Sequence, residues 1–109
     1  MATTYKVLGQ VNPSATTAST LYTVPSNTQT VVSTITVANL AGSAATFRVS
    51  VRPAAETQAN KHYIAYDVTV GANDTTTLTL GITLATTDVV TVYASTSNLA
   101  FNAYGSEIA

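Results

Sequence analysis

The residues best suited to chemical contacts lie close together in the middle of the chain. The twenty positions from 48 to 67 contain most of the charged residues, the only histidine and two of the six tyrosines: Arg48, Arg52, Glu56, Lys61, His62, Tyr63, Tyr66 and Asp67. Arginine and tyrosine are enriched where proteins meet, because a guanidinium offers fixed donors and a phenol combines apolar area with a hydroxyl. We therefore predict a protein-contact site with six members: Arg48, Arg52, Lys61, His62, Tyr63 and Tyr66.

A plainer interpretation of this segment is also open. Arg48 and Arg52 would only keep the outer face of one strand solvated, while Tyr63 and Tyr66 lie on opposite faces of another strand and one packs inward. A further candidate contact residue is Leu40, at the tip of a predicted hairpin loop with the sequence NLAGSAA (39–45). Its side chain either anchors a neighbouring protein or folds back over the end of the domain.

Catalytic and metal chemistry find little support in the sequence. One histidine and nine serines carry almost no information about a Ser/His/Asp arrangement, and no G-x-S-x-G motif is present. A transition-metal site needs several converging ligands, but His62 has no second histidine and the chain has no cysteine. Asn73 and Asp74 beside Gly71 are read more simply as a turn than as a calcium loop. We expect no enzyme activity, no metal and no cofactor.

The amino-acid composition also limits the kinds of partner that the protein can bind. The 109 residues are 46% hydrophobic and only 8% charged, with a net charge of −1. Four basic residues cannot form the basic face that nucleic-acid binding requires. No apolar run approaches the roughly 18 residues of a membrane helix, and MATTYKVLGQ lacks the pattern of a signal peptide. We expect a chain made in the cytoplasm, not exported by a signal peptide, that binds neither nucleic acid nor membrane.

The elements that position these residues are predicted from a period-two pattern rich in β-branched residues. Eight strands are expected, at residues 4–11, 20–24, 31–37, 47–52, 62–70, 75–80, 88–95 and 98–105. Turns are predicted after Pro25, at 71–74 and at 95–98, while 54–61 is too short a helical stretch to organise a fold. Residues 1–109 are therefore predicted to form one all-β domain, a two-sheet antiparallel sandwich resembling a jelly roll.

Alternation also predicts which side chains face the core. Val31, Ile35 and Val37 share one parity and are expected to point inward. In the next strand Phe47, Val49 and Val51 alternate with Arg48, Ser50 and Arg52, which predicts a dry face and a solvated face.

A resemblance extends over nearly the whole chain. It is carried by VLGQVNPSATTASTLYTVPSNTQTVVSTITVAN, then TFRVSVRP, NKHYIAYDVTV, NDTTTLTLGITL, DVVTVYAS and FNAYGSEI, taken in this order. The succession resembles small structural proteins in the virions of tailed bacteriophages. The resemblance implies a virion component without catalytic or ligand-binding residues.

The low charge suits such a role, because a protein bound to many identical neighbours gains from a surface that favours association. Our leading expectation is a non-enzymatic cement or decoration protein that binds the major capsid protein of the assembled shell. We expect it to act as a homo-oligomer, possibly a trimer.

Two other functions stay open. A baseplate, neck or tail-fibre component is the first alternative, and a carbohydrate-binding module that uses its tyrosines is the second. A cell-surface immunoglobulin-like domain is weaker, since the cysteine pair and the tryptophan are missing.

Overall fold

The computed structural model describes residues 2–109 and contains eight β-strands in this range. Their bounds are β1 Thr3–Val11, β2 Ser19–Thr23, β3 Gln29–Asn39, β4 Ala45–Arg52, β5 Tyr63–Val70, β6 Thr75–Leu84, β7 Val89–Ala94 and β8 Leu99–Ile108. Each of the eight predicted strands is confirmed. Two of them, β6 and β8, run three to four residues further than predicted, because Gly81 and Gly105 lie within strands and do not end them.

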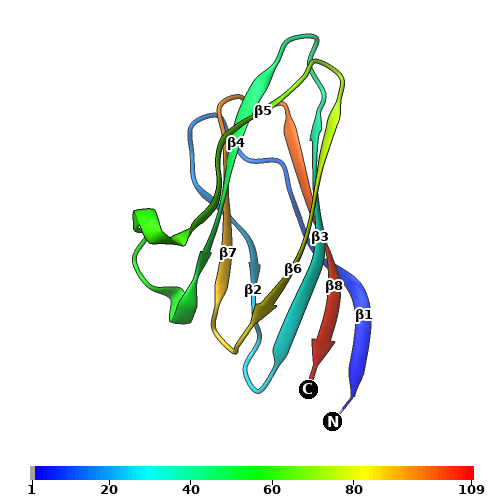
Figure 1. Cartoon of the computed structure of the whole chain (residues 1–109), viewed down its shortest axis with the longest axis vertical. Helices are drawn as coiled ribbons and strands as arrows, with labels where there is room; N and C mark the ends of the chain where they lie inside the picture. Colours follow the sequence, from blue (N-terminus) through cyan, green and yellow to red (C-terminus); the bar gives the residue numbers. More distant parts are fainter. Residues whose placement is uncertain (1) are drawn as a thin grey trace.

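The strands form two four-stranded antiparallel sheets with the order β1-β8-β3-β6 in one and β2-β7-β4-β5 in the other. We call them the first and the second sheet. The sheets face each other (Figure 1), and this strand order is that of a jelly roll. The predicted two-sheet sandwich is therefore confirmed.

The core fills the space between the two sheets. Phe47 and Phe101 come from opposite sheets and meet edge to face, with ring centroids 6.0 Å apart. Val49, Val92 and Ile35 are buried around them, as alternation along their strands requires. The predicted inward position of Phe47 and Val49 is confirmed, and Val51 lies partly buried at the margin of the same cluster.

A β-bulge overturns one predicted core residue. The register of β3 shifts between Val32 and Thr34 against both of its neighbours, which leaves Ser33 as an extra residue. An extra residue reverses the parity of the strand before it. Val32 is therefore buried in place of Val31, which lies on the outer side, whereas Ile35 and Val37 point inward as predicted.

The connection between β4 and β5 forms a small lobe over the second sheet. It contains two short 3-10 turns, Pro53–Ala55 and Asn60–His62, in place of a longer helix. The lobe covers Ser50, whose hydroxyl donates to Gln58 Oε1 at 2.7 Å and which is almost fully buried. The prediction that Ser50 lies on a solvated face was wrong, because alternation along a strand does not reveal a loop that folds back over it.

Candidate functional site

A cluster of aromatic rings around one arginine lies on the outer face of the second sheet. The guanidinium of Arg48 lies between two rings, with its central carbon 4.2 Å from the centroid of Tyr66 and 4.3 Å from that of Tyr93. Tyr63 packs edge-on against Tyr66, with 4.9 Å between centroids. Asp67 accepts a hydrogen bond from Arg48 Nε at 2.7 Å. We call these five residues the tyrosine-arginine cluster.

Irregular pairing between β4 and β5 brings the two tyrosines together. Two consecutive residues of β4 pair with Ala65 and Tyr63, which leaves Ile64 as an extra residue of β5, as in a bulge. The bulge changes the parity within β5, so Tyr63 and Tyr66 share the outer face. The interpretation that they lie on opposite faces with one packed inward was wrong.

The guanidinium of Arg48 is held between its neighbours and remains charged. The hydrogen bond from Arg48 to Asp67 raises the pKa of the guanidinium further above its ordinary value. Cation–π contacts on both sides fix the orientation of the group without neutralising it. Tyr66 is 56% exposed, and an open depression of about 330 Å³ lies against Asn60, Tyr63 and Tyr66. A partner would therefore meet a preorganised aromatic surface.

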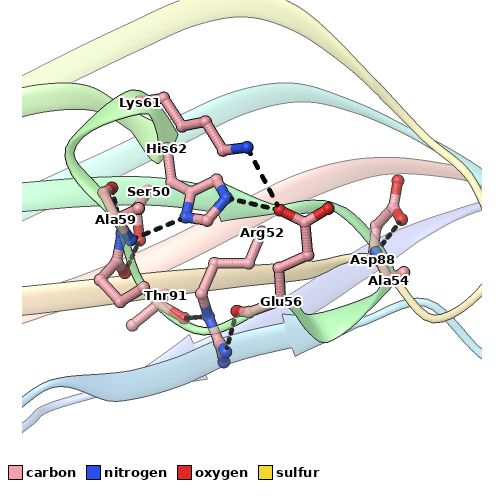
Figure 2. A network of polar contacts seen from close by, with 10 residues as sticks. Ser50, Arg52, Ala54, Glu56, Ala59, Lys61, His62, Asp88 and Thr91 are labelled. Atoms are coloured by element: carbon pink, nitrogen blue, oxygen red, sulfur yellow. Dashed lines mark hydrogen bonds and ion pairs between the residues drawn. The ribbon is translucent and has the colours of Figure 1, made fainter.

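The other predicted contact residues form a separate network within the lobe (Figure 2). Arg52 donates to the hydroxyl of Thr91 at 3.2 Å and to the carbonyl oxygen of Glu56 at 2.9 Å. The carboxylate of Glu56 lies 3.2 Å from His62 Nε2 and 3.7 Å from Lys61 Nζ. These contacts fasten the lobe to the sheet. We call Arg52, Glu56, Lys61 and His62 the lobe network.

His62 is a structural residue of this network, and its ring is buried. Only 5% of it is exposed, and its Nδ1 accepts a hydrogen bond from the N–H of Ala59 at 3.0 Å. The Nε2 therefore carries the proton and donates to Glu56. Nothing in the sequence indicated this burial, because a histidine in a polar segment does not reveal that a loop covers it, and a contact through His62 stays a prediction. Lys61 stays well exposed.

The loop between β3 and β4, which carries Leu40, and the lobe lie at opposite ends of β4 (Figure 1). Leu40 is 67% exposed. The loop that carries it is held by Asn39, whose amide donates to the carbonyl oxygens of Ser43 and Val70. Its side chain does not fold back over the domain, so that expectation was wrong. The structure leaves Leu40 available for a contact but separate from the tyrosine-arginine cluster.

Sequence reasoning missed a second surface, the outer face of the first sheet. Among the described residues of its four strands only Lys6 and Glu107 are charged, and both lie on the other side of the sheet. We call this surface the uncharged face. Its principal residues are Tyr5, Val7, Val31, Thr34, Thr36, Thr75, Thr77, Thr79, Thr83, Asn102 and Tyr104. Threonine at each of positions 75, 77 and 79 was a signal for it in the sequence.

Lys6 and Glu107 belong to a polar chain at one end of the sandwich. Glu107 accepts from Lys6 Nζ at 3.2 Å and from the hydroxyl of Tyr22, which joins the two sheets. The Tyr22 hydrogen bond, followed by Lys6, lowers the pKa of Glu107. Burial and the same hydrogen bond raise the pKa of Tyr22 to about 12. These polar contacts among Lys6, Glu107 and Tyr22 stabilise the fold.

Each charged side chain within residues 2–109 has an internal partner. Three ion pairs account for six of them, Arg52 is bound by the lobe, and Asp74 and Asp88 accept from backbone N–H groups. In this range no three His, Cys, Asp or Glu side chains form a group that could hold a metal ion. The described part of the chain also contains no helix of the length and apolar character needed to cross a membrane.

Comparison with known proteins adds no relative. No protein-family model matches the sequence, and no curated protein shows significant similarity to it.

Proposed function

We propose that this chain is a non-enzymatic structural protein of a tailed-bacteriophage virion, a cement or decoration protein that binds the assembled capsid shell. It would do so in several copies, as a homo-oligomer. The proposal starts from the resemblance of the whole sequence to small virion proteins. It is supported by a fold in which the charged side chains are used internally and one face of the sandwich is uncharged.

The observation that carries the proposal is the tyrosine-arginine cluster. An exposed, preorganised aromatic group loses little conformational freedom on binding, and Tyr and Arg are the residues that most often dominate protein interfaces. Nothing in the cluster resembles a nucleophile activated by a neighbouring base. The cluster is therefore suited to recognition, and we assign the contact with the major capsid protein to it.

The first test is the number of copies in purified virions, measured by quantitative mass spectrometry. A decoration protein should approach the number of capsid subunits. A few copies per particle would instead favour the baseplate, neck or tail fibre and would reject the capsid version.

The second test addresses the surface. We expect Tyr66→Ala to reduce co-sedimentation of the purified protein with assembled shells at least tenfold. Tyr5→Ala is the matched control, because Tyr5 is the most exposed large hydrophobic residue and lies on the other sheet. Equal binding of Tyr66→Ala and the unmodified protein would reject this contact site.

A second candidate function, carbohydrate binding, is favoured by the depression between Asn60, Tyr63 and Tyr66. Sugar rings stack on aromatic side chains, and an amide can hydrogen-bond their hydroxyl groups. A glycan array distinguishes the two functions. Binding that is lost in Tyr66→Ala would establish the sugar site, and an array without binding would remove it.

A further inference from the structure

The four edge strands of the sandwich differ in how they are protected against pairing with another chain. An edge strand exposes unpaired N–H and C=O groups, and proteins usually protect it with a charge, a proline, a bulge or a short length. β1 carries Lys6 and shifts register beside Leu8, β2 has only five residues, and β5 is interrupted at Asp67.

β6 lacks most of these features. It is ten residues long and contains neither a charged residue nor a proline. Its only interruption is a register shift around Leu80 and Gly81, so Thr75–Thr79 forms an uninterrupted stretch paired with β3 on one side. Beyond the ladder with β3, β6 makes no backbone–backbone hydrogen bond to the described chain, and only the N–H of Thr75 donates to a side chain, Asp74 Oδ1, at 2.8 Å. The other side of this stretch is therefore free to pair.

The core is also incompletely covered along this side of the sandwich. β1 packs against β2 on the opposite side, whereas β6 makes few contacts with β5. Leu78 and Ile82 point inward from β6 but stay only partly buried, as do Ala65 and Val68 on β5. A strand added to β6 would cover this apolar margin.

We propose that β6 is the strand through which two copies of this chain associate, by antiparallel pairing of Thr75–Thr79 with the same residues of a second copy. A twofold contact must be self-complementary, because each residue meets its counterpart on the other copy. With Thr77 on the twofold axis, Thr75 lies opposite Thr79 of the second copy, and cross-strand threonine pairs are favourable. A charged edge would repel itself in this arrangement, but this stretch has no charge to oppose.

The inference deepens the proposed function and rests on one part of it, the association of copies into a homo-oligomer. The two are tested separately, since self-association is measured on the purified protein alone and shell binding with shells. A chain that binds shells but stays monomeric in solution at all concentrations overturns only the pairing through β6. A chain that dimerises but does not bind shells overturns only the proposed function.

The experiment uses the full chain and measures its mass by analytical ultracentrifugation over a range of concentrations. We expect a dimer whose dissociation constant rises at least a hundredfold in Thr77→Lys, because two lysines then lie opposite each other. The matched control is Thr36→Lys, on the same face and opposite Thr77 in the register, but on the central strand β3. Circular dichroism confirms that each variant is folded.

Two variants with opposite charges at position 77 provide a second test, in which association is restored and an unfolded variant cannot be mistaken for a monomer. Thr77→Lys and Thr77→Glu should each be monomeric alone and should form a mixed dimer when combined, detected by native mass spectrometry. Four results would overturn the inference: a trimer, a dimer unaffected by Thr77→Lys, equal disruption by Thr36→Lys, or no association of the mixed variants.

Discussion

The two outer faces of the sandwich are built from the same kind of strand but present different surfaces. The face of the second sheet carries the tyrosine-arginine cluster and the lobe network, and its charges are paired among themselves. The face of the first sheet is uncharged and rich in threonine. The few charged side chains are therefore distributed unevenly between the two outer faces. The face that carries them is suited to specific recognition, and the uncharged one to close packing against neighbours.

Both faces depend on one core, and the largest effect is expected where that core is broken. Phe47→Asp places a carboxylate between the sheets at a position with no exposed surface, where no described partner can pair with it. We expect loss of the folded state, seen as loss of the cooperative thermal transition in circular dichroism. Thr34→Asp, on the uncharged face, is the control and should unfold cooperatively. A cooperative transition in Phe47→Asp would contradict the shared core.

The lobe network can be divided into a buried and an exposed part. His62→Ala leaves the N–H of Ala59 without its acceptor and should lower the free energy of unfolding by about 1–3 kcal/mol. Lys61→Ala removes only an exposed ion pair and should leave the urea midpoint unchanged. If both substitutions had the same effect, the lobe would not be held by its buried histidine.

The hydrogen bond between Tyr22 and Glu107 makes the stability of the fold depend on pH at both the acid and the alkaline extreme. The lowered pKa of Glu107 means that its contribution is present above the ordinary value of 4.5 and is lost as the pH falls through the lower folded value. The raised pKa of Tyr22 makes the stability fall at alkaline pH instead. Its contribution is present below 10.0 and is lost as the pH rises toward about 12.

Urea midpoints measured from acid to alkaline pH check this dependence. Tyr22→Phe should flatten the alkaline loss, since no phenol then titrates at this position. An alkaline loss of the same size in Tyr22→Phe would assign the effect to other tyrosines.

A small effect on stability is also expected in the tyrosine-arginine cluster. Arg48→Ala removes a partly exposed ion pair and two ring contacts, so the unfolding midpoint should change little. Binding to the partner should nevertheless fall, because Tyr66 loses the group that fixes its ring. Arg48→Lys is the matched control and keeps the charge without the planar stacking. A large loss of stability in Arg48→Ala would make the cluster structural.

Alternation was enough to predict the sandwich because the strand segments between the register shifts alternate regularly, although five of the six strand pairs contain a shift. It placed Phe47 and Val49 inward correctly, since their strand has no interruption on that side. It failed at Val31 and at the Tyr63 and Tyr66 pair, where an extra residue reverses the parity. Such bulges depend on the partner strand and have no local sequence signal that alternation can read.

The position of the tyrosine-arginine cluster was predictable in part for a related reason. A concentration of arginine and tyrosine marks the segment, and Arg48, Tyr63 and Tyr66 do come together on one face. The burial of His62 and Ser50 was not predictable, because it follows from how the connection between β4 and β5 folds back. The uncharged face combines strands from both halves of the chain, which only the topology reveals.

The strand pairing also has a consequence for how the chain folds. β4 pairs with β5, β3 with β6, β2 with β7 and β1 with β8, so the pairs are nested around the lobe. Each pair that forms shortens the loop that the next pair must close, which lowers its entropic cost. We expect folding to start at the lobe and to spread toward the chain ends. The lobe network would then set the folding rate as well as hold a surface loop in place.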